Sequence, residues 1–246
     1  MALLPQSERG RPMRIAIVEN TRVTHHGQVG VALHEAAAVI DLYRPYLGQP
    51  LPEGTSDHDA IVVFGGEQSA LDDRIHPYLP RLAGLMAAFA GAEKAVLGIC
   101  LGSQVLARGL GAQNLLGVAP EFGWCDVALT PEAAGDPLLS GLPESFPIFQ
   151  WHSDNFTLPP GALHLASSAV AAQQAFRFGR ATYGFQFHFE ANRAVAADWV
   201  RRFPDLVEAT SPGFAGRMGA AAAREGVIAD AVGLAIARGW VGLVRR

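Results

Sequence analysis

The sequence predicts an α/β fold built on a mixed sheet, and two features of the 246-residue chain indicate it. From residue 14 to about residue 110, short apolar runs alternate with longer segments of helical periodicity, as in parallel strands joined by crossover helices. After Gly111, short strands follow one another between turn residues, which predicts antiparallel additions to that parallel core. Half of the residues are apolar, so a chain of this length can bury a sizeable core.

The first half of the chain supplies the parallel strands and their helices. Residues 14–18 and 94–99 are apolar and rich in β-branched side chains, as strands buried on both faces are. Residues 75–90 carry leucine, methionine and phenylalanine at helical spacing. The elements expected here are strands at 14–18, 38–43, 59–64 and 94–99 and helices at 29–38, 75–90 and 103–110.

The second half supplies the antiparallel strands and then returns to helices. No internal repeat or low-complexity linker interrupts the chain, so we expect one domain over residues 1–246, with its core at about 14–190 and C-terminal helices over 191–246. The elements expected here are strands at 124–129, 147–151, 163–167, 174–178 and 183–188 and helices at 191–207 and 217–244.

Composition excludes several classes of protein. A formal net charge of −4 and a pI near 6.0 argue against a general nucleic-acid binder, which needs a basic surface. Two cysteines cannot form a disulfide framework, so a reducing compartment is expected. Residues 1–13 lack the apolar core of a signal peptide, and charged residues interrupt the apolar stretch 226–244. We therefore expect a cytoplasmic protein with no membrane span.

The sharpest local feature is a cysteine between an apolar strand and a helical segment. Gly98-Ile99-Cys100-Leu101-Gly102 follows the strand expected at 94–99, which is the arrangement of a nucleophile elbow with cysteine in place of serine. The flanking glycines permit a turn too tight for side chains, and the N–H groups that begin the next helix favour a thiolate. A free thiol, with a pKa near 8.5, is only a few per cent ionised at neutral pH. The alternative is a buried structural cysteine in front of a helix.

A cysteine nucleophile needs a base, and His188 is the best candidate among eight histidines. The two-residue period of a strand places Gln186, His188 and Glu190 on one face and three phenylalanines on the other. At the end of a core strand, His188 would accept the proton of Cys100, and Glu190 would orient its imidazole. A histidine on a strand can also be purely structural.

Two further segments have both a functional and a structural interpretation. Gly65-Gly66 follows the strand expected at 59–64, where a backbone N–H of the loop and that of Leu101 would form an oxyanion hole. The structural alternative is a plain turn at the end of the strand. The polar cluster 150–155 is either a substrate-binding loop or an aromatic-anchored surface turn, and its spacing does not decide between them.

Together these segments resemble the class I, triad-type glutamine amidotransferases over about residues 14–190. GICLGSQ resembles that family's G-x-C-x-G-x-Q motif, and FQFHFE its final strand with His-x-Glu. VFGGEQSALDD resembles its oxyanion strand and Gly-Gly loop, and QWHSDNFTLPPGALHLASS the W-H-G-D segment of stand-alone members related to the amidase domain of GMP synthase. The resemblance implies a three-layer α/β/α, flavodoxin-like fold that hydrolyses the side-chain amide of glutamine to glutamate and ammonia. We expect it to use neither a metal nor another cofactor.

The resemblance also implies residue roles. Cys100 would be the nucleophile, His188 the general base and acid, and Glu190 the partner that orients the imidazole. Gly66 and Leu101 would supply the N–H groups of the oxyanion hole. The residues that would hold the amino and carboxylate ends of glutamine are Gln104, Trp151, Ser153 and Asp154.

Three positions depart from the family pattern. Phe189 stands where proline is common, but the spacing from histidine to glutamate is unchanged, so we expect little effect. Ser153 replaces a common glycine in the W-H-G-D segment, which bears on the glutamine contacts. Glu67 follows Gly66 where many relatives have proline, which bears on the oxyanion loop.

Other sites and activities can be weighed from the residues. DJ-1 and related proteases share the fold but place histidine directly after the cysteine, where this chain has Leu101. His25-His26 has no partner at metal-ligand spacing, and Cys125 has no elbow or nearby base, so we expect a structural thiol there. No P-loop or pyrophosphatase motif indicates a fused synthetase, so ammonia would pass to a separate partner or be released.

Two alternatives to glutamine hydrolysis remain. The same triad would cleave any γ-glutamyl amide for which the site has room, so a γ-glutamyl conjugate hydrolase is the first. The second is a catalytically silent module that binds glutamine or regulates a partner.

Overall fold

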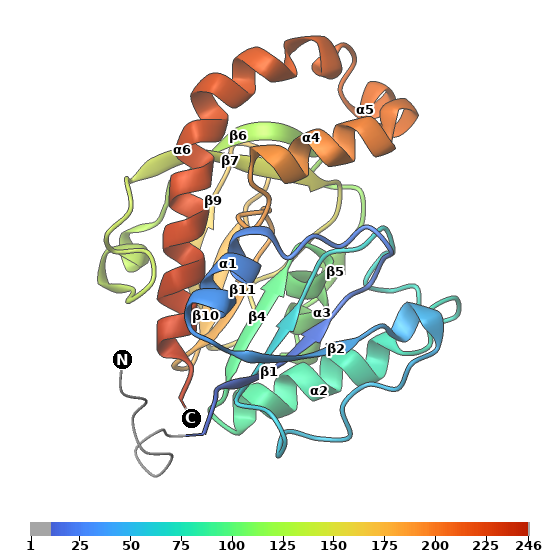
Figure 1. The fold of residues 1–246 in the computed structure, drawn as a ribbon, viewed down its shortest axis with the longest axis vertical. Helices are drawn as coiled ribbons and strands as arrows, with labels where there is room; N and C mark the ends of the chain where they lie inside the picture. Colours follow the sequence, from blue (N-terminus) through green and yellow to red (C-terminus); the bar gives the residue numbers. More distant parts are fainter. Residues whose placement is uncertain (1–10, 246) are drawn as a thin grey trace, which may run out of the picture.

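The computed structural model describes residues 11–245. Most of residues 1–13, for which no signal peptide is predicted, therefore lie outside the described residues. Within this range the chain forms a nine-stranded mixed sheet in the order β2-β1-β3-β4-β11-β10-β9-β6-β7 (Figure 1). The first five strands in this order are parallel: β2 Val39–Tyr43, β1 Arg14–Val18, β3 Ala60–Val63, β4 Ala95–Ile99 and β11 Thr182–Phe185. The other four are antiparallel to their neighbours: β10 Ala175–Phe178, β9 Leu163–Ser167, β6 Glu121–Leu129 and β7 Ser145–His152. The predicted parallel core with antiparallel additions is therefore confirmed, and its parallel part has the flavodoxin-like order.

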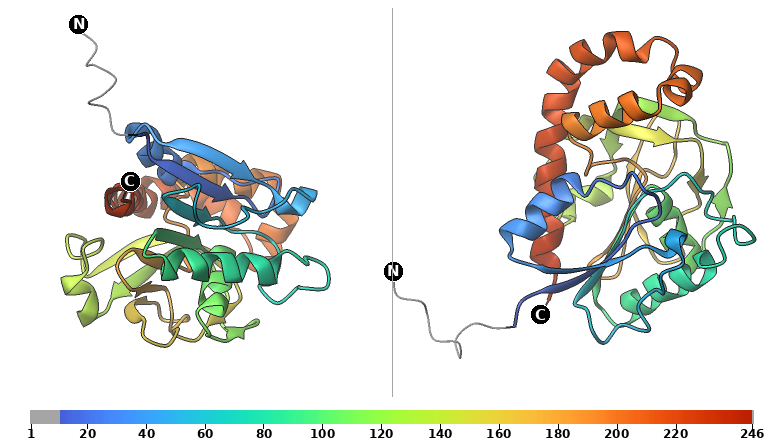
Figure 2. Two further views of the ribbon diagram at one scale, coloured as in Figure 1. Left: turned by 90° about the horizontal axis from the view of Figure 1, so that it is seen from below. Right: turned by 45° about the vertical axis from the view of Figure 1, so that its right-hand side comes forward.

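Helices cover both faces of the sheet, which completes the expected three layers (Figure 2). Alternate side chains of each parallel strand point to opposite faces, so Ile15 and Ile17 join one core cluster and Ala16 and Val18 the other. The helices on the first face are α1 Gly27–Glu35 and α6 Phe214–Leu243, and those on the second face are α2 Leu79–Gly91 and α3 Leu101–Gly109.

Several predicted element boundaries are corrected by the structure. The helix expected at 75–90 begins only at Leu79, because Pro80 lacks the N–H needed to continue a helix from an earlier turn. The helix expected at 191–207 is two helices, α4 Arg193–Arg202 and α5 Pro204–Thr210, separated at the residue before Pro204. The small pair β5 Asn114–Leu115 and β8 Asn155–Phe156 and the 3₁₀ helices η2 Pro45–Leu47 and η3 Pro131–Gly135 were not predicted.

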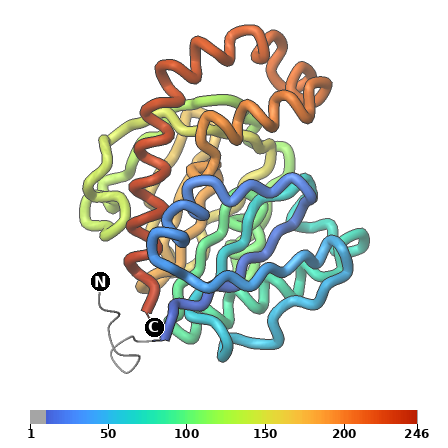
Figure 3. Tube along the Cα trace, in the orientation of Figure 1, coloured from blue at the N-terminus to red at the C-terminus, as the bar shows by residue number. Residues whose placement is uncertain are grey.

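The longest helix, α6, runs the length of the molecule, from the end where α4 and α5 lie to the end where β1 begins (Figure 3). Of the helices described, it alone is long and apolar enough to cross a membrane by length and composition. In the structure 44% of its most apolar window is buried, and the helix contacts β7 and α1. The core helix of a soluble protein meets the same criterion of length and composition.

Candidate active site

Cys100 lies at the junction of β4 and α3, where the chain reverses direction within one residue. Its backbone has φ +51° and ψ −112°, a conformation that costs a residue with a side chain about 1–3 kcal/mol. Helix α3 starts at the next residue, and the backbone N–H groups of Ser103 and Gln104 donate to the Cys100 carbonyl at 2.9 and 3.2 Å. The thiol therefore projects from a strained turn at a helix N-terminus, the end that carries partial positive charge.

The two glycines of the elbow allow backbone segments to approach closely. A Cβ atom on Gly98 would lie 2.5 Å from the Gly102 carbonyl oxygen, and one on Gly102 would lie 2.0 Å from the Val63 carbonyl oxygen. Both distances are shorter than any stable carbon–oxygen contact. These positions require glycine because α3 packs directly on the ends of β3 and β4, and this packing fixes the position of Cys100.

His188 and Glu190 form a buried pair beside Cys100. His188 Nδ1 and Glu190 Oε1 are 2.7 Å apart, and the two residues are 6% and 2% exposed. A Cβ on Gly65 would lie 3.2 Å from His188 Cε1 and 3.4 Å from Cys100 Cβ, so the imidazole and the cysteine face the same short backbone segment. The structure thus brings the three predicted residues together.

The route by which His188 reaches this position differs from the prediction. The strand expected at 183–188 ends at Phe185, whose carbonyl accepts a hydrogen bond from Cys100 N at 2.8 Å. The chain then crosses toward β7, where His188 N donates to the Phe149 carbonyl at 2.8 Å. The predicted alternation of sides persists without a strand, because Phe187 packs in the core while His188 faces Cys100.

The electrostatic environment of His188 favours the charged imidazolium. Burial lowers the pKa of His188, but the charges of Glu190 and of the Cys100 sulfur outweigh burial and raise this pKa well above its ordinary value. The Trp199 ring packs edge-on against the imidazole, with ring centroids 5.1 Å apart. The site is therefore arranged to hold a proton on His188 next to sulfur.

The predicted oxyanion residues lie next to each other beside Cys100. Gly66 belongs to the loop after β3, and a Cβ on it would lie 3.0 Å from Leu101 Cδ2. Leu101 is the first residue of α3, so no carbonyl within that helix can accept its N–H. Glu67, which follows Gly66, has an exposed side chain that accepts a hydrogen bond from Thr21 Oγ1 at 3.4 Å.

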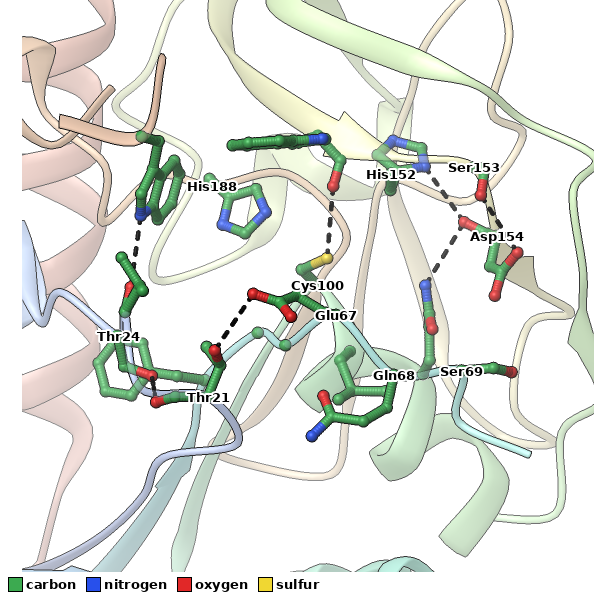
Figure 4. A pocket seen from close by; sticks show the side chains of 18 of the residues that line it. Thr21, Thr24, Glu67, Gln68, Ser69, Cys100, His152, Ser153, Asp154 and His188 are labelled. Atoms are coloured by element: carbon green, nitrogen blue, oxygen red, sulfur yellow. Dashed lines mark hydrogen bonds between the residues drawn. The ribbon is translucent and has the colours of Figure 1, made fainter. Parts of the chain in front are cut away.

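The four predicted substrate-binding residues line the same pocket as Cys100 and His188 (Figure 4). Gln104 Nε2 donates to Gln186 Oε1 at 3.1 Å and to the Asp154 carbonyl at 3.4 Å. Asp154 Oδ1 accepts from Gly117 N at 2.8 Å and from the Ser153 hydroxyl at 3.4 Å. The Cys100 thiol lies 3.8 Å from the Trp151 carbonyl oxygen.

A second buried imidazole–carboxylate pair supports this loop. His152 Nε2 lies 3.3 Å from Glu121 Oε2 and 3.1 Å from Gln150 Oε1, and its Nδ1 lies 3.1 Å from the Asp154 carbonyl oxygen. The pair fixes the end of β7 on the side of Cys100 away from His188 (Figure 4). The sequence placed His152 in a polar cluster, but Glu121 carried no signal.

The pocket has a volume of about 590 Å³ and extends well beyond the predicted residues. Its additional walls come from the loop after β1 and from α4 and α5, which no motif identified. His25 Nε2 binds Asp198 Oδ2 at 2.8 Å, and Trp199 Nε1 donates to the Val23 carbonyl at 3.4 Å, so this loop and α4 are joined. The added lining residues include Val23, Thr24, His25, Trp199, Phe203 and Leu206.

Other candidate groups lie elsewhere or have other partners. Within residues 11–245, no group of three or more histidine, cysteine or acidic residues could hold a metal ion. His26 Nε2 binds Glu19 at 2.9 Å, so the two adjacent histidines engage different carboxylates. Burial, with the nearby carboxylates of Glu121 and Asp126, raises the pKa of Cys125 to about 11.

Comparison with known proteins decides the family. The family model described as glutamine amidotransferase class I matches residues 31–203, most of the chain. The chain belongs to the class I glutamine amidotransferases. The elbow and the buried His188–Glu190 pair of this chain both lie within the matched segment.

Relatives and solved structures agree with this assignment. The chain is 35% identical over 150 residues to the glutamine amidotransferase-like protein YfeJ of Salmonella typhimurium, and the alignment covers 60% of this chain and 63% of that protein. It is 31% identical to one of the subunits of the glutamine-hydrolysing GMP synthase of Natronomonas pharaonis, over 78% of this chain and 97% of the relative. A glutamine amidotransferase structure from Thermotoga maritima superposes with a TM-score of 0.81 at 25% identity, covering 94% and 99% of the two chains.

Proposed function

We propose that this protein hydrolyses the side-chain amide of L-glutamine to glutamate and ammonia. The observation that supports this most is the junction of a strained cysteine elbow with a buried, charge-paired histidine in one pocket. A cysteine that only stabilised the fold would need neither the strained backbone nor a neighbouring His188–Glu190 pair.

Each residue has a defined step in the proposed reaction. The Cys100 thiolate attacks the amide carbon, and the N–H groups of Gly66 and Leu101 stabilise the oxyanion. His188 then gives its proton to the leaving nitrogen, and ammonia departs from a glutamyl thioester. A water molecule, deprotonated by His188, cleaves the thioester and restores the thiolate. Glu190 keeps the imidazole oriented and stabilises its charge throughout.

The glutamyl half of the substrate is assigned to the side of Cys100 where Asp154 lies. There the Gln104 amide and the backbone of residues 151–154 would hold the α-amino and α-carboxylate groups. Ser153 adds a hydroxyl where many relatives have glycine, and its bond to Asp154 Oδ1 keeps the loop in place.

The ammonia has two possible fates in this proposal. Relatives of the chain are subunits of a glutamine-hydrolysing synthase, which favours delivery to a separate partner protein. Residues 1–246 would then act as one amidase unit, and release into solution is the outcome if no partner binds. The γ-glutamyl amide hydrolase uses the same chemistry, and a silent glutamine-binding module is the remaining alternative.

The deciding experiment measures ammonia released from L-glutamine by the full chain. We compare wild type with Cys100→Ala and with Cys125→Ala, a control that removes the other thiol. Release that is lost only with Cys100→Ala supports the proposal. Equal release from wild type and Cys100→Ala, or glutamine binding without turnover by the wild type, would overturn it.

A further inference from the structure

The pocket extends past Cys100 in two directions (Figure 4). On one side lie His152, Ser153 and Asp154, where the proposed function places the glutamyl half of the substrate. We call the opposite side the amine lobe; the residues that bound it are Thr21, Thr24, Glu67, His188 and Trp199.

The amine lobe makes the pocket larger than glutamine requires. A volume of about 590 Å³ lies within the range of roughly 300–1,000 Å³ that holds drug-sized ligands. The leaving group of glutamine is only ammonia, which would occupy the space next to His188 and leave the rest of the lobe unfilled. A larger leaving group would use it.

The charges that line the pocket indicate which leaving group fits. No lysine or arginine is among the lining residues in the described part of the chain. Glu67 points into the amine lobe, accepts a weak hydrogen bond from Thr21 and forms no ion pair within residues 11–245. The basic side chain of the neighbouring wall, His25, is bound to Asp198. The charge of His188 is paired with that of Glu190, so the unpaired carboxylate of Glu67 at the rim sets the remaining charge of the lobe.

The inner wall of the amine lobe is aromatic. Trp199 is 8% exposed, and its ring packs against the imidazole of His188 and the ring of Trp151, with centroids 5.1 and 6.0 Å away. Its indole N–H is directed to the Val23 carbonyl, so the part of the ring that lines the pocket is apolar. Methylene groups pack on such a surface, and a cation near it is further stabilised by the ring.

We propose that the amine lobe binds the leaving half of a γ-glutamyl amide whose amine carries a second, positively charged group. This inference rests on the proposed acyl chemistry of Cys100. The leaving nitrogen must lie within hydrogen-bond reach of His188, so the chain of the amine runs past the imidazole along Trp199. Its charged end then reaches the carboxylate of Glu67.

The reaction is balanced without an oxidant or reductant. The bond between Cys100 Sγ and the γ-carbonyl carbon forms, the carbon–nitrogen bond breaks, and the diamine leaves with a proton from His188. Water then adds to the thioester carbon, gives one proton to His188 and releases glutamate and the thiolate. The substrate class is a γ-glutamyl conjugate of a diamine.

Binding to the Cys100→Ala variant of the full chain tests the amine lobe apart from turnover. The probes are the γ-glutamyl amides of diaminobutane, pentylamine and aminobutyrate, which present a cationic, a neutral and an anionic end at similar length. By isothermal titration calorimetry we expect the diaminobutane amide to bind about five- to twentyfold tighter than the pentylamide, and the aminobutyrate amide to bind weakest.

Glu67→Gln, added to this variant, should reduce the preference for the cationic amide over the neutral one by about fivefold. The matched control is Asp72→Asn, which removes a different pocket carboxylate, one held by the Ser69 N–H at 3.0 Å, and should leave the preference unchanged. Equal binding of the three amides, or a preference that survives Glu67→Gln, overturns the proposal.

Amine and ammonia release by the wild type separates the two hypotheses. Hydrolysis of glutamine without a preference for the cationic amide refutes the amine lobe alone. A cationic preference in binding, with no hydrolysis of any substrate, supports the amine lobe and refutes the amidase.

Discussion

Replacing Glu190 by glutamine removes one negative charge beside His188 and preserves the size of the side chain. Glu190 Oε1 lies 2.7 Å from His188 Nδ1 in the interior. A glutamine can keep an oxygen in that place and put its amide nitrogen where Oε2 lies, an atom without a hydrogen-bond partner in the described structure. The orientation of the ring is then preserved, so the substitution isolates the effect of charge.

The separation of the two groups limits the size of the effect. At 2.7 Å, two unit charges attract by about 6 kcal/mol when the effective dielectric constant is about 20. This value is an upper limit for the substitution, because the neutral amide oxygen still accepts the hydrogen bond. We therefore expect kcat/KM for glutamine to fall by about 10²- to 10⁴-fold, which corresponds to about 3–5 kcal/mol of transition-state stabilisation.

The substitution should also lower the pKa of His188. Burial opposes the charged imidazole, and without Glu190 only the Cys100 sulfur remains to offset burial. In the wild type, the raised pKa of His188 stabilises the folded protein. This stabilisation is complete below the pKa of the unfolded chain, about 6.5, and is lost as the pH rises through the pKa of the folded protein. The stability difference between wild type and Glu190→Gln should thus be larger near about pH 6 than near about pH 9.

Two measurements test the role of Glu190, the titration of His188 by ¹⁵N NMR and urea unfolding at both pH values. The matched control is Glu121→Gln, which removes the buried carboxylate 3.3 Å from His152 and should leave the His188 titration unchanged. If Glu190→Gln retained kcat/KM within about threefold of wild type, or left the pKa of His188 in place, the assignment of Glu190 would be wrong.

Two other predictions concern the elbow and the thiols. Gly102→Ala should lower the free energy of unfolding by about 3 kcal/mol or more, since its Cβ would lie 2.0 Å from a carbonyl oxygen. The control is Gly84→Ala in α2, where a Cβ meets open space and should raise the free energy of unfolding by about 0.5–1 kcal/mol. Urea unfolding measures both changes. Because the pKa of Cys125 is about 11, only about one Cys125 thiol in a thousand is ionised at about pH 8. Iodoacetamide should therefore label Cys100 first in the folded protein, which peptide mass spectrometry can detect. Labelling of both thiols at similar rates in the folded protein, and not only after unfolding, would contradict this.

The parts of the site that local sequence determines could be predicted. The elbow depends on two glycines within five residues of each other. Because both glycines are visible in the sequence, the close backbone contacts that they allow could be predicted. His188 and Glu190 point to the same side because side chains alternate along an extended chain. This prediction therefore holds although the strand ends at Phe185. That end could not be predicted, because it depends on where β11 stops pairing with β4.

The amine lobe could not be predicted, because its walls come from segments that are far apart in the sequence. In the sequence Glu67 is only a departure from a family pattern, and Trp199 lies in the helix expected at 191–207, where no functional residue was predicted. The contact between the loop after β1 and α4 depends on the His25–Asp198 and Trp199–Val23 hydrogen bonds. The break between α4 and α5 did have a signal, Pro204, which disfavours a helical conformation at the preceding residue.

In the proposed reaction, the chemistry and the choice of substrate depend on different parts of the chain. The position of Cys100 is fixed by backbone contacts that allow no side chain at Gly98 or Gly102, so those residues cannot change without moving Cys100. Glu67 is exposed and Trp199 belongs to another packed cluster, so neither residue makes the close contacts that fix Gly98 and Gly102. Under the proposed function, chains with the same elbow can therefore differ in the amine they release. The choice of substrate is therefore proposed to lie in the amine lobe rather than in the motif that identifies the family.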